Sequence, residues 1–324
     1  MKLPPKLAHS VRFYILSAML CQALTLSPPP ASGQALTIDQ KLGATIEERI
    51  RESGADVAIA FGTLDGHLAY AFHDEESFHA ASTMKIPVMI ELFHQARQAR
   101  LKLDDALLVK NQFHSLADGS FYTLDPADDS ETDLYKAEGQ TRSLRQLCEL
   151  MITASSNLAT NLLIEKLGVD NIRATVHTLH ADGMNVLRGV EDNKAFLEGL
   201  NNTTTARGLE LLLEAIAHGE AVDQESSRQM MEILERQKFN EGIPAGLPPG
   251  TRVAHKTGEI TRIHHDAAIV FAPKPFVLVI LVRGLAESKD SAALMADITR
   301  QLYQATQLHR SFAQPGPAVL HPTQ

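Results

Sequence analysis

A lysine inside an apolar run, three residues after a serine, is the first feature of this sequence that could do chemistry. The stretch "HAASTMKIPVMIEL" at 79–92 places Lys85 three residues after Ser82. Side chains at i and i+3 share a helix face, so we expect the Lys85 amine to reach the Ser82 hydroxyl. Burial or a second cation would lower the pKa of this amine until it accepts the serine proton. Taken alone, the pair also fits a lysine that snorkels at a helix start.

Two further short motifs follow along the chain. "SSN" at 155–157 precedes the helical stretch "NLATNLLIEKLG", and on its own it predicts a turn with Asn157 as the helix N-cap. "HKTGE" at 255–259 places Lys256, Thr257 and Gly258 at the end of an expected strand, where an edge lysine and a permissive glycine are ordinary. Each motif is weak evidence by itself.

The three motifs together are much more specific. Ser-x-x-Lys, Ser-x-Asn and Lys-Thr-Gly each occur once, in the order found in penicillin-binding proteins and class A β-lactamases. Ser155 follows Ser82 by 73 residues, and Lys256 follows Ser155 by 101. The sequence resembles the class A β-lactamase family and its serine-hydrolase relatives from about Thr37 to Gln307.

A fourth element resembles the omega loop of that family. "RGVEDNKAFLEGLNNTTTA" at 188–206 places Glu191 36 residues after Ser155, where the family has a glutamate that aligns the deacylating water. The alternative for Glu191 is a solvated loop carboxylate, and the neighbouring Asp192 is expected to be one.

The resemblance implies a serine β-lactamase that works through an acyl-enzyme. Ser82 would attack the lactam carbonyl, and Lys85, or Glu191 acting through water, would take its proton. Backbone N–H groups of Ser82 and Glu259 would form the oxyanion hole. Glu191 would then activate the water that releases the product.

The remaining motif residues would bind substrate or move protons. Ser155 would relay a proton to the leaving nitrogen, with Lys256 keeping its surroundings positive. Asn157 would bind the substrate's side-chain amide, and Lys256 and Thr257, followed by Gly258, would receive the substrate carboxylate.

The sequence departs from the family pattern at two positions that bear on turnover. Ser156 stands where most class A enzymes have Asp, and Ala195 stands where the family usually has an Asn that also holds the water. Asn193 or Asn201 is the expected replacement for that Asn.

Two departures concern the rim of the cleft. The strand after Lys-Thr-Gly lacks the usual arginine, so Arg262 or Arg283 is the candidate cation for the substrate carboxylate. Segment 111–140 is longer than its counterpart and should edge the cleft. It is expected to supply either a solvated acidic loop or an aromatic wall from Phe121, Tyr122 or Tyr135.

Periodicity places the motifs on a mixed fold. Strands are expected at both ends of the chain, at 56–64, 67–72, 252–260, 266–272 and 276–284, with helices between them and none of the strands in 100–206. The fold class is α/β (α+β): a five-stranded antiparallel sheet flanked by helices, with an inserted all-helical domain, similar to β-lactamases and transpeptidases. The expected domains are a discontinuous sheet domain (34–80 and 207–308), a helical domain (81–206) and a tail (309–324).

The N-terminus and the charge indicate export. Residues 1–33 have a charged start, an apolar run and small residues before a cleavage position, as a signal peptide does. Their removal changes the net charge from −9 to −12, which argues against nucleic acid or anionic membrane as partners. We expect a periplasmic or secreted monomer whose partner is a small β-lactam.

No cofactor or metal is expected. Cys148 lies at an apolar helical position and is read as a buried, inert thiol. His264 and His265 are adjacent in an expected strand, so they point to opposite faces and do not readily share one ion.

Two other functions compete with a β-lactamase. One is a penicillin-binding or DD-peptidase-like serine hydrolase, against which the Glu191 loop argues. The other is a β-lactam-binding module that deacylates slowly, which the alanine at 195 favours.

Overall fold

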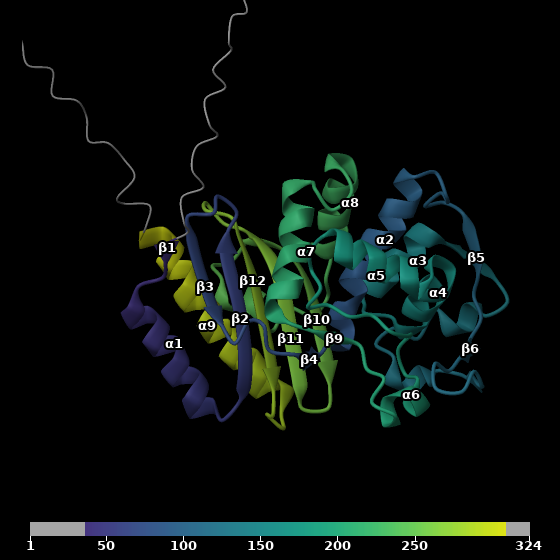
Figure 1. The fold of residues 1–324 in the computed structure, drawn as a ribbon, viewed down its shortest axis with the longest axis horizontal. Coiled ribbons are helices and arrows are strands. Elements are labelled where there is room, and N and C mark those ends of the chain that lie inside the picture. Colours follow the sequence, from purple (N-terminus) through teal and green to yellow (C-terminus); the bar gives the residue numbers. More distant parts are fainter. Residues whose placement is uncertain (1–35, 309–324) are drawn as a thin grey trace, which may run out of the picture. The chain divides into compact units, whose positions relative to one another are not determined.

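A single central sheet carries the strands from both ends of the chain (Figure 1). The structure is a computed structural model that describes residues 36–308. Five antiparallel strands form the sheet in the order β3-β2-β12-β11-β10. They are β2 (Asp56–Thr63), β3 (Leu68–Phe72), β10 (Arg252–Ile260), β11 (Ile263–Phe271) and β12 (Phe276–Arg283). This confirms the predicted fold class, and the two-residue strand β1 (Leu36–Thr37) adds a parallel edge beside β3.

The sheet is buried on both faces, which explains why its central strands read as almost continuous apolar runs. Successive residues of β12 point to opposite faces. Val277, Val279 and Leu281 belong to the core under the larger set of helices. Phe276, Leu278, Ile280 and Val282 belong to the core under the other helix layer.

Different helices cover the two faces (Figure 1). The N-terminal helix α1 (Gln40–Ser53) and the C-terminal helix α9 (Ser288–Leu308) pack on one face. Helix α7 (Ala206–His218) packs on the other face, against β2, β11 and β12. Helix α8 (Gln224–Leu234) contacts both α7 and β10, and the short η4 (Ile243–Gly246) follows it in the chain.

The middle of the chain is mainly helical. It contains η1 (Ala81–Met84), α2 (Lys85–Arg97), η2 (Pro126–Asp128), η3 (Tyr135–Ala137), α3 (Leu144–Thr153), α4 (Asn157–Leu167), α5 (Val169–Thr178) and α6 (Asn193–Leu197). A capping box of Ser143 and Gln146 opens α3. Cys148 of this helix is buried, and its burial raises the pKa of the thiol to about 12, as an inert cysteine requires.

The expectation that 100–206 holds no strand is wrong in detail. Short strands pair within it as β5 (Ala106–Leu108) with β8 (Thr141–Ser143), and β6 (Phe113–His114) with β7 (Phe121–Tyr122). Strand β9 (Thr203–Thr204) pairs with β4 (Phe78–His79). Two or three residues are too few to show the alternation by which a strand is recognised in a sequence.

The expected signal peptide at 1–33 and tail at 309–324 lie outside the described residues. The described residues fall in one compact unit, so the boundaries proposed between a sheet domain and a helical domain stay predictions. Within residues 36–308, none of the helices is long and apolar enough to cross a membrane.

Candidate functional site

Ser82 lies on a strained turn between a short strand and a buried helix. It is the second residue of η1, directly after Ala81, whose φ of 45° is unusual for a residue with a side chain. The N–H of Ala81 donates to His79 Nδ1 over 3.0 Å, which fixes the turn. The start of this helix is distorted: one 3-10 turn precedes α2, and Pro87 is the third residue of α2. Strained backbone held in this way is typical of functional sites.

Gly258 lets strand β10 approach the backbone of Ser82 closely. A Cβ atom at Gly258 would lie 3.1 Å from Ser82 N and 3.2 Å from Ala81 Cβ. The N–H of Ser82, at the start of η1, therefore lies next to the end of β10. N–H groups in the first turn of a helix have no acceptor within that helix, so this group needs an acceptor from outside it.

Lys85 is completely buried, and its amine faces the start of α4. Its Nζ donates to Ser155 O over 2.7 Å, to Ser155 Oγ over 3.1 Å and to Asn157 Oδ1 over 2.9 Å. The expected contact with the Ser82 hydroxyl is absent from the hydrogen bonds of residues 36–308. Ser82 belongs to the 3-10 turn whereas Lys85 begins the α-helix, so the regular i, i+3 geometry does not apply between them.

Burial lowers the pKa of Lys85 to about 7, although the negative charges of Asp129 and Glu191 oppose the shift. An amine with this pKa is partly neutral at physiological pH. It is therefore able to accept a proton, as a general base must.

A second buried lysine meets the same serine. Lys256 Nζ donates to Ser155 Oγ over 3.0 Å and to Thr257 O over 2.7 Å. Its burial, together with the charge of Lys85, holds the pKa of Lys256 well below its usual range, while Asp266 acts in the opposite direction. Ser155 itself has a φ of 57°, so the second motif is also backbone-strained.

Asn157 connects the first motif to the omega-like loop. Its Nδ2 donates to Glu191 Oε1 over 2.5 Å while its Oδ1 accepts from Lys85. Burial raises the pKa of Glu191, the bond from Asn157 lowers it, and the nearby Asp129 and Asp128 raise it further. Ser156, not Asn157, is the N-cap of α4, with its Oγ accepting from Ala159 N over 3.2 Å.

The cleft has two lobes that share Ser82, Asn157 and Glu259. The Glu191 lobe, about 340 Å³, is also lined by His79 of β4 and by loop residues, chiefly Arg188, Val190, Glu191, Asn193 and Phe196. The Thr257 lobe, about 440 Å³, is also lined by Asp128, Ser130, Ser155, Thr257, His264 and Lys289. Lys85, Lys256 and Gly258 are buried behind this surface or beside it.

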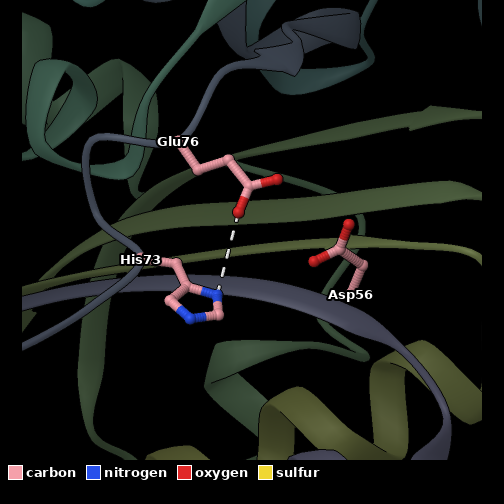
Figure 2. Close-up of side chains that lie close together, drawn as sticks. All are labelled: Asp56, His73 and Glu76. Atoms are coloured by element: carbon pink, nitrogen blue, oxygen red, sulfur yellow. Dashed lines mark ion pairs between the residues drawn. The ribbon is translucent and has the colours of Figure 1, made fainter.

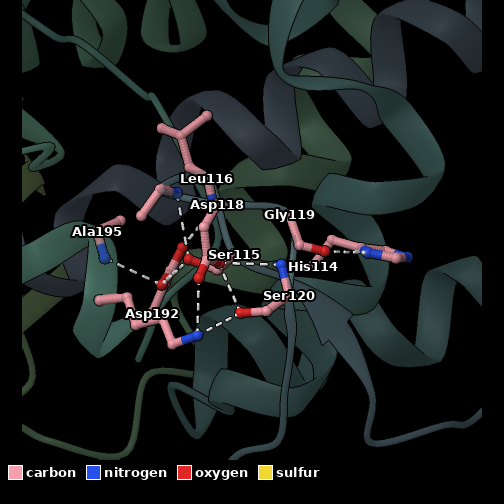
Figure 3. A network of polar contacts seen from close by, with 10 residues as sticks. His114, Ser115, Leu116, Asp118, Gly119, Ser120, Asp192 and Ala195 are labelled. Atoms are coloured by element: carbon pink, nitrogen blue, oxygen red, sulfur yellow. Dashed lines mark hydrogen bonds and ion pairs between the residues drawn. The ribbon is translucent and has the colours of Figure 1, made fainter.

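Asp192 is a structural residue, so the expectation that it is a solvated carboxylate is wrong. It is almost fully buried and accepts hydrogen bonds from Ser115 Oγ at 2.7 Å, Leu116 N at 2.8 Å and Ala195 N at 3.2 Å (Figure 3). These bonds tie the loop of Glu191 to the turn between β6 and β7. Its exposed neighbour, Lys194, pairs with Asp118.

The possible replacements for the missing loop asparagine differ in position. Asn193 lines the Glu191 lobe. Asn201 accepts from Arg188 Nη2 over 3.2 Å. Ala195 is buried within α6. Only Asn193 of these residues lines the described lobes of the cleft.

Segment 111–140 edges the cleft, as expected, but with different residues. Phe121 is 61% exposed, the Tyr122 hydroxyl donates to Val190 O, and the Tyr135 hydroxyl donates to Asp129. None of these three aromatic residues lines either described lobe, so the aromatic wall is not formed. The segment contributes Asp128 and Ser130 to the lining of the cleft instead.

Sequence reasoning missed the buried Asp129 of this segment. Its Oδ2 accepts from Asn157 N over 2.8 Å, from Leu158 N over 3.0 Å and from the Tyr135 hydroxyl over 2.9 Å. No spacing or periodicity in the loop marks this carboxylate as a partner of the second motif.

Neither candidate arginine reaches the described cleft. Arg283 pairs with Asp56 and Glu76 at the far end of β12, and Figure 2 shows these two carboxylates beside His73. Arg262 donates to Gly284 O. The cation that does line the Thr257 lobe is Lys289, an exposed residue in the first turn of α9.

Among the described residues, one group of histidine and carboxylate side chains is close enough together to hold a metal ion, and an arginine already pairs with it. Ligand atoms of Asp56, His73 and Glu76 lie within 4.8 Å of one another. Their side chains are exposed, and the Arg283 guanidinium pairs with both carboxylates, which disfavours a second cation there. His265 is buried against His79 O, whereas His264 lines the Thr257 lobe.

Comparisons with known proteins agree with this geometry. A model of the beta-lactamase enzyme family matches residues 41–306. Beta-lactamase ROB-1 of Haemophilus influenzae is 25% identical over 297 residues, which cover 89% of this chain and 92% of ROB-1. Among solved structures, a beta-lactamase from Sphaerobacter thermophilus has a TM-score of 0.72 at 27% identity and covers 84% of this chain and 99% of its own. PBP-A has a TM-score of 0.74 at 25% identity, with coverages of 85% and 98%.

Proposed function

Because this chain belongs to the beta-lactamase enzyme family, we propose that it is a serine β-lactamase that hydrolyses the lactam amide through an acyl-enzyme on Ser82. The observation that carries the proposal is the bridge made by Asn157. Its amide links the Lys85 amine, which has a pKa near 7, to the Glu191 carboxylate beside the cleft. One linked pair thus holds the proton acceptors that acylation and deacylation need.

In the acylation step, Ser82 Oγ forms a bond to the lactam carbonyl carbon, and the carbon–nitrogen bond of the ring breaks. The serine proton passes to Lys85, or through water to Glu191, and the substrate nitrogen receives a proton from Ser155, which regains one from the protonated Lys85 amine across their hydrogen bond. Ser155 is suited to this role because its oxygen already accepts from two buried lysines, which leaves its own proton free to be donated.

The tetrahedral oxyanion is expected to bind the N–H groups of Ser82 and Glu259. The close approach of β10 to Ser82 N at Gly258, the residue before Glu259, supports this assignment. A donor of this kind is typically worth about 3 to 4 kcal/mol of activation free energy.

Substrate recognition is assigned to the two lobes of the cleft. The Thr257 lobe would receive the substrate carboxylate, with Thr257, the buried Lys256 and the exposed Lys289 providing hydroxyl and positive charge. The Glu191 lobe would hold the acyl side chain, and Asn157 lies between the lobes, where it can bind the side-chain amide.

Deacylation is assigned to Glu191. Its carboxylate would take a proton from water as the water oxygen attacks the ester carbon and Ser82 Oγ leaves with a proton. Asn157 orients the carboxylate. Asn193 lines the Glu191 lobe and is the loop amide expected to replace the asparagine that the family has at position 195.

A slowly deacylating penicillin-binding protein is the second candidate function. Two observations favour it: the similarity to PBP-A and the alanine at 195, which removes an amide from the water site implied by the family. The hydrogen bond from Asn157 to Glu191, which orients this carboxylate at the cleft, favours turnover instead.

The cellular setting belongs to the same proposal. The charged and apolar pattern of residues 1–33 supports export, and the negative net charge argues against nucleic acid and anionic membranes as partners. A monomeric, periplasmic or secreted enzyme is therefore expected.

The test is intact-protein mass spectrometry after mixing the protein with benzylpenicillin, sampled from seconds to hours. A transient adduct on Ser82 with release of penicilloate is expected. Ser82→Ala should form no adduct, and Glu191→Gln should form one that persists. Glu198→Gln, an exposed carboxylate in the same loop, is the matched control and should behave as the wild type. A persistent wild-type adduct would support the penicillin-binding function, and no adduct at all would overturn the substrate class.

A further inference from the structure

Asp129 is a buried carboxylate outside all the catalytic motifs, yet it contacts one of them directly. It lies between η2 and η3 in segment 111–140, is 7% exposed, and is 28 residues away in sequence from Asn157. Its four hydrogen bonds come from Asn157 N, Leu158 N, the Tyr135 hydroxyl and Glu131 N. A carboxylate with this number of partners holds one defined position.

The contact is made at the N-terminus of α4. Asn157 and Leu158 are the first two residues of this 11-residue helix, and Ser156 Oγ accepts from Ala159, the third. Two side chains thus satisfy three of the N–H groups that have no acceptor within the helix. Negative charge at this end of a helix is favourable. Asp129 therefore fixes the first turn of α4 from outside the helix.

Fixing this turn also fixes the side chain that leaves it. Asp129 accepts a hydrogen bond from the backbone N–H of Asn157. The side-chain amide of the same Asn157 bridges Lys85 Nζ and Glu191 Oε1. A small movement of this turn would separate the amine from the carboxylate. We propose that Asp129 is a positioning residue of this enzyme, which aligns Asn157 between Lys85 and Glu191 and whose negative charge governs where the proton of that pair resides.

The charge part of the proposal agrees with the electrostatics of the cleft. Asp129 favours the protonated form of both partners, since it raises the pKa of Glu191 and opposes the lowering of the pKa of Lys85. The titratable and charged groups around these three residues are Asp128, Glu131 and Tyr135 from the loop, and Lys256 with Asp266 from the sheet.

This inference rests on the proposed function, so its test uses steps that the proposed function defines. Asp129→Asn removes the charge and keeps the shape, and Asp129→Ser is a second neutral variant that retains an acceptor oxygen. The rate of acyl-enzyme decay is followed from pH 4.5 to 9 by mass spectrometry. Acylation is followed over the same range in each variant combined with Glu191→Gln. Thermal unfolding reports the fold.

The acidic limb of the deacylation profile should move to lower pH by about 0.5 to 1 unit in both neutral variants, because a like charge near Glu191 is gone. The acidic limb of acylation should move in the same direction, because the Lys85 ammonium loses a nearby anion. Deacylation at its plateau should fall about tenfold as Asn157 loosens. Tyr135→Phe, which removes one hydrogen bond to the same carboxylate and leaves its charge, should keep both limbs in place.

Unchanged profiles and rates in a folded neutral variant would overturn the inference while the proposed function stands. A fall in rate that is equal at every pH and follows a loss of stability would show that Asp129 is only structural. If the wild type forms no adduct, the proposed function fails, and this inference fails with it.

Discussion

Lys85 and Lys256 donate hydrogen bonds to the same atom, the hydroxyl oxygen of Ser155, over 3.1 and 3.0 Å. Both lysines are fully buried, and each has its pKa lowered by burial. Two ammonium groups around one oxygen in a dry site repel each other, and the charge of Lys85 lowers the pKa of Lys256 further. The pair therefore favours a state with fewer than two protons, and Ser155 is placed between a proton donor and a proton acceptor.

Ser155 is therefore expected to be needed for proton transfer. Ser155→Ala should lower kcat/KM about 100- to 10,000-fold, the range of general acid–base groups, with acylation as the slowed step. The measurement is the rate of adduct formation on Ser82 under single-turnover conditions.

The adjacent serine is the matched control for that variant. Ser156→Ala removes the N-cap of α4 and should cost about 1 kcal/mol of unfolding free energy with little change in kcat. Similar losses of activity in the two variants would mean that the motif acts through the fold of α4 and not through the Ser155 hydroxyl.

The protonation of Lys85 should set the pH dependence of acylation. In Glu191→Gln the acyl-enzyme accumulates, so acylation is seen alone. A base must be neutral, and Lys85 is neutral above its pKa of about 7, so the rate should rise with pH through that region. The midpoint should lie slightly below that of the wild type, because this variant removes an anion that favours the ammonium.

Stopped-flow measurements between pH 5.5 and 9 test this dependence. Lys85→Arg, whose guanidinium keeps its proton throughout, should lose the rise. A rate that is the same at pH 5.5 and 8.5 in Glu191→Gln would exclude Lys85 as the base.

The sheet and the motif positions could be predicted from sequence because they depend on local patterns. Strands β2, β3 and β12 have the expected bounds within one residue, since apolar runs and the Asp65–Gly66 turn mark them. Ser82, Ser155 and Lys256 were singled out by residue type and order, and the structure brings their elements to one cleft.

The partners of those residues could not be predicted. Asp129 reaches Asn157 through a loop with no periodicity, and Asp192 is buried only because the β6–β7 turn covers it. Arg283 lies at the end of a strand, and the direction of its side chain depends on its partners, Asp56 and Glu76. Such contacts are decided by tertiary packing of polar groups, for which a single sequence holds no spacing rule.

The buried Asp192 should hold the loop of Glu191 in place. Asp192→Ala leaves three donors without their acceptor and is expected to lower the unfolding free energy by about 2 to 4 kcal/mol. Deacylation should slow about tenfold while acylation changes less, because the loop carries Glu191 and not Ser82. Decay of the acyl-enzyme and thermal unfolding measure the two effects.

Lys194→Ala is the control in the same loop. Its pair with Asp118 is exposed, so neither stability nor deacylation should change measurably. If Asp192→Ala loses stability but deacylates at the wild-type rate, the network in Figure 3 supports the fold alone.

Lys289 is expected to bind the substrate carboxylate, the role for which the sequence suggested Arg262 or Arg283. It is the exposed cation lining the Thr257 lobe of the described cleft, whereas Arg283 pairs with Asp56 and Glu76. Lys289→Ala should raise KM for benzylpenicillin about five- to tenfold with kcat nearly unchanged, because the carboxylate is bound equally in the ground and transition states. Arg283→Ala should leave KM as it is.

Since an exposed charge is screened by salt, the difference in KM between wild type and Lys289→Ala should shrink in 0.5 M sodium chloride. Equal KM values for the wild type and Lys289→Ala at low salt would show that Thr257 and the buried Lys256 hold the carboxylate without it.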